Sequence, residues 1–307
     1  MNLHQLEYVL AVNQHRHFAR AAEACHVTQP TLSMMIQKLE EELEIKIFDR
    51  SRQPVCPTDA GEKLILQCKA VLVEAERLKE MAKEEREYIG GQLRIGVIPT
   101  IAPYLLPLFI QSFHQKYPEV ELKISEMITP RILEKLESGE LDAGILVPPE
   151  NEKGVKTIPL YTEAFVVYSP REFEKEYLLA DDINADELLL LEEGHCFRSQ
   201  IIQFCELRKQ SGNAIEYTSG SLETLRNLAD KHLGITILPE LATLNFTPEQ
   251  LKKTKQFASP QPVREVGLIM SRGYVKKKLI DLLAEEIRAS LPTESIKNDS
   301  QLIPFTG

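Results

Sequence analysis

The sequence lacks the features that identify membrane proteins, secreted proteins and metalloenzymes. No apolar run reaches the ~18 residues of a membrane span, and no basic segment followed by an apolar block opens the chain. The five cysteines have mixed spacings that match neither a secreted disulfide framework nor a zinc site. The sequence also contains no glycine-rich phosphate loop and no pair of histidines clustered with an acid. We therefore expect a cytoplasmic protein with no cofactor, no metal and no membrane partner.

Positive charge is also scarce. The 307 residues include 36 Lys and Arg against 46 Asp and Glu, which gives a net charge of −10. Within residues 1–60, six basic residues stand against eight acidic ones. This balance excludes a general electrostatic attraction to nucleic acid, so any DNA contact must depend on a few well-placed cations. The length predicts two or three domains.

Residues 1–58 show helical periodicity with one sharp interruption. Apolar residues recur at helical spacing between Leu6 and Ala22, and the pattern breaks at residues 25–27. Thr28 then provides an N-cap, with Pro30 in the first helical turn. Two short helices joined by a tight turn predict a helix-turn-helix. An ordinary helical hairpin with a solvated face fits the spacing equally well.

The second helix has a polar face whose side chains suit DNA. Small and amide side chains match base edges in a major groove, whereas Lys and Arg reach phosphates. The expected DNA contacts are Thr28, Gln29, Pro30, Thr31, Ser33, Gln37, Lys38, Arg50 and Arg52.

This region resembles the signature of the LysR-type transcriptional regulators. The resemblance is carried by Phe18–Ala22, Val27–Ser33, Ile36–Glu40, Leu43, Phe48–Arg50 and Thr58–Gly61. It implies a winged helix-turn-helix with its wing at residues 50–57. It also implies a homodimer that assembles to a homotetramer on palindromic double-stranded DNA and works with RNA polymerase. Glu44 departs from the pattern, because the family usually has glycine there, and we expect a different cap at the end of the recognition helix.

Residues 59–89 predict one long linker helix. After Gly61 the segment contains neither glycine nor proline, and its apolar residues follow a 4-4-3-4-3-4 spacing. This seam consists of Ala60, Leu64, Cys68, Val71, Ala75, Leu78 and Ala82. Such a seam is typical of a coiled coil, and similar linker helices pair dimers in the LysR family. Gly90 and Gly91 end the helix.

Residues 90–307 have the alternating pattern of an α/β domain. Strands are expected at 93–98, 120–125 and 143–147, with helices at 103–116 and 129–138. A second sheet is expected from 165–169, 188–191, 214–218 and 235–238, with a helix at 221–232. A strand at 266–270 and a helix at 277–291 would return to the first lobe. The pattern resembles the two-lobed, periplasmic-binding-protein-like domain of LysR regulators, with lobe I at about 90–163 and 267–292, lobe II at about 164–266, and a loose tail at 292–307.

The segment from Gly194 to Cys205 combines two cysteines, nine positions apart, with His195 and Arg198. A thiol reacts as its thiolate, and neighbouring positive charge or a helix N-terminus lowers its pKa. In one straight helix the two Cα atoms would differ by about 13 Å in rise, whereas a disulfide needs them within about 7 Å. A Cys196–Cys205 bond therefore requires the local fold to open. Two unpaired cysteines in a core helix are the alternative.

The sensing half further resembles the peroxide-sensing members of the LysR family. The matching segments are Ile98–Thr100, Pro103–Pro107, Leu136–Asp142, Leu191–Cys196 with Cys205, Thr218, Ser221–Asn227, Gly234–Thr236 and Leu238–Pro239. The resemblance implies that Cys196 is the peroxide-reactive cysteine and Cys205 the resolving one. It also implies that Thr100, Thr129, His195 and Arg264 surround the thiolate and orient hydrogen peroxide.

The expected fold class is therefore α+β and multi-domain, with domains at 1–58, 59–89 and 90–307. The expected function is a peroxide-sensing regulator of antioxidant genes, not an enzyme, switched by a reversible disulfide. A LysR regulator that binds a small metabolite between its lobes is the main alternative. A thiol peroxidase would leave the DNA-binding half unexplained, and a purely structural protein would leave both halves unexplained.

Overall fold

The computed structural model describes residues 1–84, 89–150, 154–171, 173–192, 194–205, 220–271, 276–292 and 300–304. The chain divides into two compact units, Met1–Glu87 and Tyr88–Gly307. Among the described residues, no helix is both long and apolar enough to cross a membrane.

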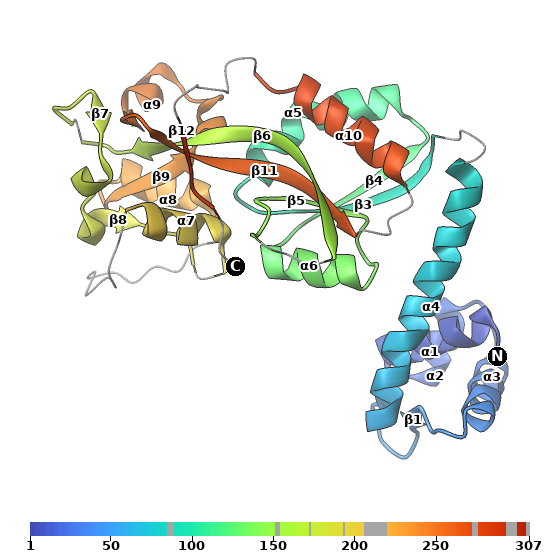
Figure 1. The fold of residues 1–307 in the computed structure, drawn as a ribbon. Helices are drawn as coiled ribbons and strands as arrows, with labels where there is room; N and C mark the ends of the chain where they lie inside the picture. Colours follow the sequence, from blue (N-terminus) through green and yellow to red (C-terminus); the bar gives the residue numbers. More distant parts are fainter. Residues whose placement is uncertain are drawn as a thin grey trace. The chain divides into compact units, whose positions relative to one another are not determined.

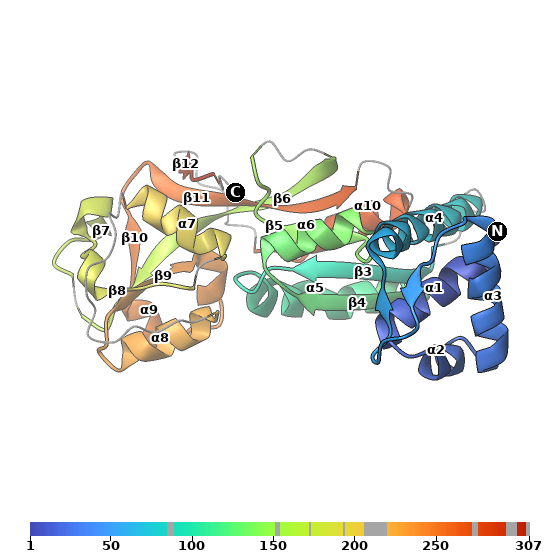
Figure 2. The ribbon, with the colours of Figure 1, turned by 90° about the horizontal axis from the view of Figure 1, so that it is seen from below.

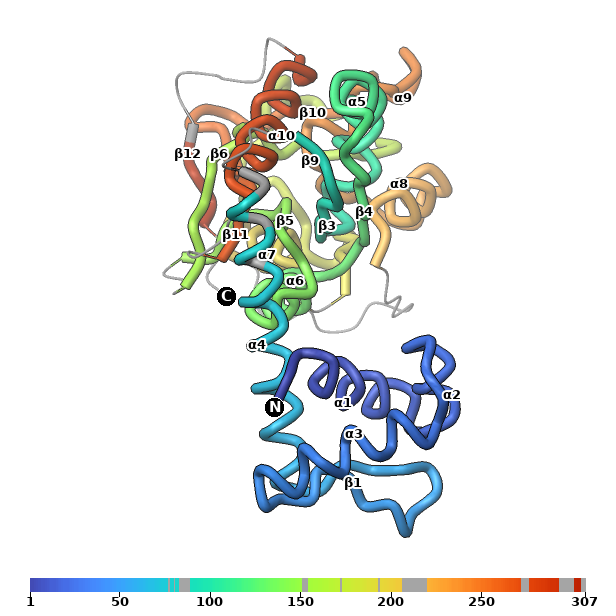
Figure 3. The backbone as a smooth tube through the Cα atoms, turned by 90° about the vertical axis from the view of Figure 1, so that its right-hand side faces the viewer, coloured from blue at the N-terminus to red at the C-terminus, as the bar shows by residue number. Residues whose placement is uncertain are grey.

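The first unit is a helical bundle followed by a short β-hairpin and a long helix. Its elements are α1 (Leu3–His15), α2 (Phe18–Ala24), α3 (Gln29–Glu42), β1 (Phe48–Asp49), β2 (Cys56–Pro57) and α4 (Asp59–Glu84). Val9, Leu32 and Ile36 are buried in its core. Figure 3 shows a tight turn between α2 and α3, and the antiparallel pair of β1 and β2 forms the wing. The winged helix-turn-helix expected from the sequence is confirmed.

The junction between α3 and the wing depends on Glu40. Its buried carboxylate accepts hydrogen bonds from the amides of Ile47 at 2.7 Å and Phe48 at 3.2 Å. After α3 the backbone turns through Glu44, whose φ of 54° lies in the left-handed region that glycine favours. Glu44 thus takes this left-handed conformation although it is not glycine. A non-glycine residue adopts this cap at a cost of about 1 kcal/mol.

The first half of α4 packs on the bundle, and its later part exposes apolar side chains. Ile65 and Cys68 are buried in the core of this unit, and Leu64 packs partly against it. Further along, the side chain of Leu78 is 71% exposed and that of Met81 is 54% exposed. On the predicted seam, the bundle therefore covers Cys68, whereas Leu78 is exposed in the single chain.

Lobe I of the second unit is a three-layer arrangement around parallel strands. Its elements are β3 (Gly91–Val97), α5 (Ala102–Lys116), β4 (Val120–Glu126), α6 (Thr129–Glu137), β5 (Ala143–Leu146) and α10 (Lys277–Ala289). β3 pairs in parallel with both β4 and β5, as the alternating apolar pattern predicts. α5 and α10 cover one face of this sheet and α6 covers the other (Figure 1).

Lobe II and the connecting strands complete the second unit. Their elements are β6 (Val155–Tyr168), β7 (Tyr177–Leu178), β8 (Leu188–Leu189), α7 (Cys196–Phe204), α8 (Leu222–Asp230), β9 (Ile235–Pro239), α9 (Pro248–Lys252), β10 (Thr254–Phe257) and β11 (Gln261–Ser271). The short 3-10 helices are η1 (Ala180–Asp182), η2 (Ala185–Glu187) and η3 (Glu240–Thr243). The strand expected at 214–218 lies outside the described residues.

Two long strands, β6 and β11, run antiparallel through both lobes (Figure 2). They join the strands into one sheet with the order β4-β3-β5-β11-β6-β10-β7, and β9 pairs with β6. The prediction of a separate second sheet is therefore wrong, because the crossing strands themselves carry the hydrogen-bond ladder from one lobe to the other.

The C-terminal segment contains an ordered strand. β12 (Ser300–Leu302) pairs in parallel with β11, and the Ile303 amide donates to the Val263 carbonyl at 2.8 Å. The Ile303 side chain is buried in the lobe II core. The expectation of a loose tail is therefore wrong for residues 300–303, because this strand pairs with β11 and Ile303 is buried in the lobe II core.

Candidate functional site

Cys196 is the first residue of α7 and is almost completely buried, with 3% of its surface exposed. Gly194 prepares the start of the helix, because its φ of 93° is a conformation that side-chain-bearing residues rarely adopt. The thiol packs in the lobe I core although α7 itself belongs to lobe II. Cys196 therefore lies where the two lobes meet, and it is in the free thiol form.

Three residues expected at the site come from three different elements of the fold. Thr100 follows β3, Thr129 begins α6 and Arg264 lies on β11, and all three are buried. Arg264 donates to the Thr100 hydroxyl at 3.0 Å and to the Thr100 carbonyl at 3.1 Å. Both Arg264 and the Thr129 hydroxyl lower the pKa of Cys196. The structure thus brings Thr100, Thr129 and Arg264 together around the thiol.

Burial nevertheless has the largest effect on the pKa of the Cys196 thiol. Desolvation raises its pKa, and this effect outweighs the opposing effects of Arg264, the Thr129 hydroxyl and the amides at the start of α7. The sequence-based expectation of a lowered pKa is therefore wrong. The resting thiol is predominantly protonated at neutral pH, and polar neighbours are already placed to receive its thiolate.

The cation at this site is Arg264 and not Arg198. The Arg198 guanidinium donates to the Leu191 carbonyl at 2.8 Å, which holds the loop before α7. Burial lowers the pKa of His195 below its usual value, with Glu192 opposing this shift. His195 is consequently neutral at pH 7, and its ring Nε2 lies 3.7 Å from the Glu192 carboxylate, so the structure places it against Glu192 and not with the three residues around the thiol.

Thr129 carries a buried hydroxyl directed at the Cys196 thiol, whose pKa it lowers. Its Oγ1 atom nevertheless completes no hydrogen bond of good geometry with the part of the chain that the structure describes. A buried hydroxyl without a partner is costly, so such an atom marks a place where a small polar ligand would be stabilised.

Cys205 caps the other end of α7 in a different environment. Its thiol is buried in the lobe II core, and burial alone raises its pKa to about 12. In a continuous helix the two cysteine Cα atoms differ by about 13 Å in rise. Because that separation exceeds disulfide geometry, the two thiols cannot bond while α7 is intact.

Glu163 is a site residue that the sequence pattern did not single out. It lies on β6 directly opposite Arg264 on β11, and its Oε1 atom is 2.9 Å from Arg264 Nε and 2.7 Å from Nη2. The Arg264 guanidinium also lies over the Phe197 ring, 4.7 Å from its centroid. The sequence signal for Glu163 was an acidic residue directly before the apolar run 164–168. That signal could not identify Arg264 as its partner, because the pairing depends on the register between β6 and β11.

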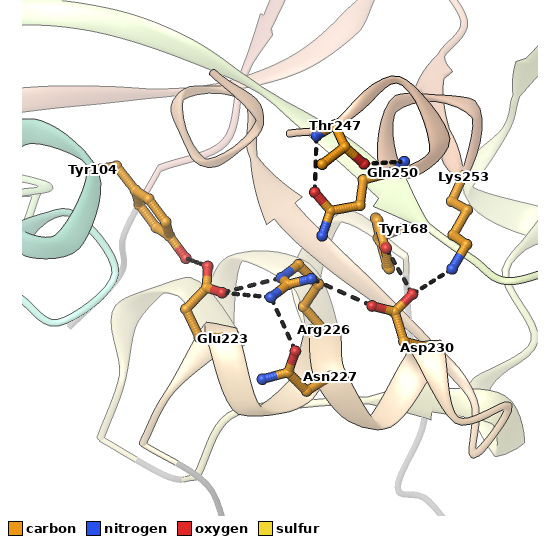
Figure 4. Close-up of polar contacts among 9 residues, drawn as sticks. All are labelled: Tyr104, Tyr168, Glu223, Arg226, Asn227, Asp230, Thr247, Gln250 and Lys253. Carbon is orange, nitrogen blue, oxygen red and sulfur yellow. Dashed lines mark hydrogen bonds and ion pairs between the residues drawn. The ribbon is translucent and has the colours of Figure 1, made fainter. Parts of the chain in front are cut away.

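A polar network ties the two lobes together near the same site. Tyr104 on α5 donates to Glu223 on α8 at 3.0 Å, and Glu223 in turn pairs with Arg226 (Figure 4). Arg226 also forms an ion pair with Asp230, whose carboxylate accepts a hydrogen bond from the Tyr168 hydroxyl. Two segments that matched the peroxide-sensing pattern separately in the sequence are thus joined in space.

The candidate DNA contacts gather on α3 and the wing. Thr28, Gln29, Pro30, Thr31, Gln37, Lys38, Arg50 and Arg52 are exposed, and Ser33 is half-buried. Several are engaged within the chain: Arg50 donates to Ser33 at 3.0 Å and pairs with Glu40, while Arg52 pairs with Asp49. Arg50 therefore connects the recognition helix to the wing in addition to any phosphate contact.

The remaining cysteines lie in the first unit. Cys68 is buried, Cys25 is half-buried beside the core, and burial raises the pKa of both. Cys56 lies in the wing. Among the described residues, no group of three or more His, Cys, Asp and Glu is placed to hold a metal ion.

Comparison with known proteins extends the resemblance seen in the sequence. The chain is 39% identical to the "DNA-binding transcriptional dual regulator OxyR" of Escherichia coli strain K12 over 297 residues, which cover 95% of this chain and 96% of that protein. The structure of a cysteine-to-aspartate variant of full-length OxyR from Pseudomonas aeruginosa is also similar. It is 36% identical, with a TM-score of 0.77, and the match covers 96% of this chain and all of that one.

A second similar structure is a cysteine-to-serine mutant of OxyR from Corynebacterium glutamicum with hydrogen peroxide bound. It is 30% identical, with a TM-score of 0.61, and the match covers 94% of this chain and 92% of that one. Two family models match the chain. "Bacterial regulatory helix-turn-helix protein, lysR family" matches residues 3–62, and "LysR substrate binding domain" matches residues 86–292. The chain therefore belongs to the LysR family of transcriptional regulators.

Proposed function

We propose that this LysR regulator senses hydrogen peroxide and is switched by a reversible Cys196–Cys205 disulfide. The observation that carries the proposal is the Cys196 site: a buried thiol at the start of α7 that faces Arg264, Thr100 and Thr129, with a second cysteine at the end of the same helix. The named relatives support it, because they include a peroxide-bound OxyR.

In the first step the Cys196 sulfur attacks one peroxide oxygen. A sulfur–oxygen bond forms, the oxygen–oxygen bond breaks, and the second oxygen leaves as water after taking up the thiol proton. The Thr129 hydroxyl, which is buried next to the thiol without a hydrogen bond of good geometry, would hold peroxide beside it. Arg264 would stabilise both the thiolate and the departing hydroxide. Cys196 becomes a sulfenic acid and peroxide is reduced by two electrons.

In the second step Cys205 attacks the sulfenic sulfur. The disulfide bond forms, the sulfur–oxygen bond breaks, and a second water leaves. Because nine helical positions separate the cysteines, α7 must unwind for this step. Between the two cysteines lie Phe197, Ile201 and Phe204, and unwinding would break some of their packing contacts. These contacts include the Phe165–Phe197 and Phe204–Phe257 ring pairs. This rearrangement would carry the signal to the rest of the second unit.

The functional division we propose is 1–58 for DNA binding, 59–89 for dimerisation and 90–307 for sensing. The exposed polar face of α3 would contact base edges, and the exposed Leu78 and Met81 on α4 would pack against a partner chain. Homodimers that assemble to tetramers, palindromic sites and a contact with RNA polymerase belong to the same proposal. A cytoplasmic location of the protein follows from its DNA-binding role.

The test uses the full-length reduced protein on duplexes selected for binding from a random pool. We expect peroxide to change the footprint, dithiothreitol to restore it, and Cys196→Ser to abolish the change while reduced-form binding persists. Cys68→Ser is the matched control and should respond like the wild type. A footprint that peroxide leaves unchanged but a small metabolite alters would overturn the proposal in favour of a metabolite-responsive regulator.

A further inference from the structure

The buried Glu163–Arg264 pair stands behind the reactive thiol. Both side chains are almost fully enclosed, with 3% and 0% of their surfaces exposed. They face each other across the β6–β11 ladder, and one carboxylate oxygen lies within 3 Å of two guanidinium nitrogens (2.9 Å and 2.7 Å). The second oxygen accepts the Leu241 amide at 3.3 Å. Glu163 is therefore fixed by backbone and side-chain contacts at once.

The guanidinium has a limited set of partners, and Glu163 determines their geometry. With its Nε and Nη2 atoms bound by Glu163, Arg264 directs Nη1 at the Thr100 hydroxyl. The face of the guanidinium covers the Phe197 ring, next to Cys196 in the chain. A carboxylate paired this closely also opposes the field that the cation exerts on the thiol, because the charges of a close ion pair largely offset each other at longer range.

We propose that Glu163 is a positioning residue for the Cys196 thiol: it aims Arg264 at Thr100 and offsets the arginine charge, so the resting thiol receives only part of the stabilisation an unopposed arginine would give. Burial raises the pKa of Cys196 and Arg264 opposes that effect, and a carboxylate held against the guanidinium weakens the opposing effect of the arginine. A sensor restrained in this way keeps its thiol protonated until a small, well-placed oxidant arrives. The sensing role assigned to Cys196 underlies this interpretation.

The direct test measures the thiolate content of Cys196 without peroxide. The full-length protein is alkylated with iodoacetamide across a pH series, and the modified cysteine is identified by mass spectrometry after trypsin digestion. Trypsin separates the two cysteines, because Arg198 lies between Cys196 and Cys205. Since iodoacetamide reports thiolate directly, failure of peroxide sensing and failure of this inference give different results.

Glu163→Gln keeps the size and the hydrogen-bond acceptor but removes the charge. We expect the pKa of Cys196 to fall by about one unit, which corresponds to about tenfold faster alkylation at pH 7. Asp142→Asn is the matched control, because it breaks another buried acid–arginine pair, with Arg94 at 2.9 Å. Arg94 lies on β3, about 10 Å of extended backbone before the strand ends at Val97, and Thr100 follows that end, so this variant should leave the Cys196 alkylation profile unchanged.

Two further measurements keep the proposal falsifiable. If Glu163→Gln folds poorly because Arg264 loses its counter-charge, the profile is recorded in trimethylamine N-oxide, which favours the compact state. In an Arg264→Met background, Glu163→Gln should shift the Cys196 pKa no further, since Glu163 acts through the arginine. An unchanged or raised pKa in folded Glu163→Gln, or an equal shift without Arg264, would overturn the proposal.

Discussion

The two ends of α7 carry the same side chain in opposite chemical settings. Cys196 and Cys205 are both buried, and burial raises the pKa of both thiols. At Cys196 a buried arginine, a threonine hydroxyl and the first amides of the helix oppose that effect. At Cys205 burial acts alone and raises the pKa to about 12. A buried thiol is inert by default, and only the end with thiolate-stabilising groups is equipped to react first.

Replacing each cysteine in turn should give the largest difference between the two ends. Cys196→Ser should abolish the reaction of α7 with peroxide, because the attacking sulfur is lost. Cys205→Ser should still form a sulfenic acid at Cys196 but should not proceed to the disulfide. Trapping with dimedone followed by mass spectrometry distinguishes the two products. Sulfenic acid at Cys205 in the Cys196→Ser protein would reverse the assigned roles.

Alkaline pH should lower stability in part through Cys205, alongside the buried Cys196, Tyr104 and Tyr168, whose pKa values burial also raises. The folded-state pKa of Cys205 is raised from 9.0 to about 12, so its contribution to stability is complete below pH 9 and is lost as pH rises toward 12. The loss amounts to at most about 4 kcal/mol. Urea unfolding at a series of pH values should show a shallower decline for Cys205→Ala than for the wild type. Parallel declines would show that Cys205 ionises as easily in the folded chain as in the unfolded one.

The C-terminal strand should matter for the Cys205 end more than for the Cys196 end. Ile303 shares the lobe II core with Cys205, and its carbonyl accepts from Gln200 in the middle of α7 at 2.5 Å. Ile303→Asp should cost about 2–3 kcal/mol and accelerate alkylation of Cys205, because it places a charge in an apolar core. Leu302→Asp is the control, since Leu302 is 54% exposed. Equal effects of the two variants on the alkylation of Cys205 would contradict the claim that the buried Ile303 shields this thiol.

Loss of the arginine should affect only the Cys196 end. Arg264→Met removes the cation that favours its thiolate, so reaction with peroxide should slow about tenfold for each unit by which the pKa rises. Glu163→Gln is combined with it so that no buried carboxylate is left unpaired. Arg198→Met is the control, because Arg198 binds the Leu191 carbonyl. Stopped-flow kinetics should show no comparable slowing in that variant, and a similar slowing would restore Arg198 as the activating cation.

Local patterns predicted the regular elements of the fold but not the long-range pairings. The strand expected at 120–125 spans Val120–Glu126, and the helix expected at 221–232 spans Leu222–Asp230. Local patterns did not predict the first part of β6 or β12, because both strands are stabilised by pairing with β11. β11 is remote from the first part of β6 and from β12 in the chain. For the same reason one continuous sheet was expected to be two.

The DNA-binding surface and the thiol site differed in how far sequence could predict them. The exposed face of α3 is contiguous, so helical spacing predicted which residues share it, and the LysR resemblance favoured DNA binding over an ordinary helical hairpin. Thr100, Thr129 and Arg264 were assigned through family resemblance, since they come from three separate elements. Sequence favoured Arg198 as the activating cation because it is close in the chain. Burial and cross-strand register, which no local pattern encodes, selected Arg264 and its partner Glu163.

The central claim is that Cys196 and Cys205 are coupled by a disulfide that intact α7 forbids. The most direct measurement is disulfide mapping of the full-length protein by mass spectrometry before and after stoichiometric peroxide, with hydrogen exchange of residues 196–205 on the same samples. We predict no bond and protected amides in the reduced protein, and a Cys196–Cys205 bond with faster exchange after oxidation. A Cys196–Cys205 bond with unchanged protection of α7, or oxidation that pairs other cysteines, would contradict the account.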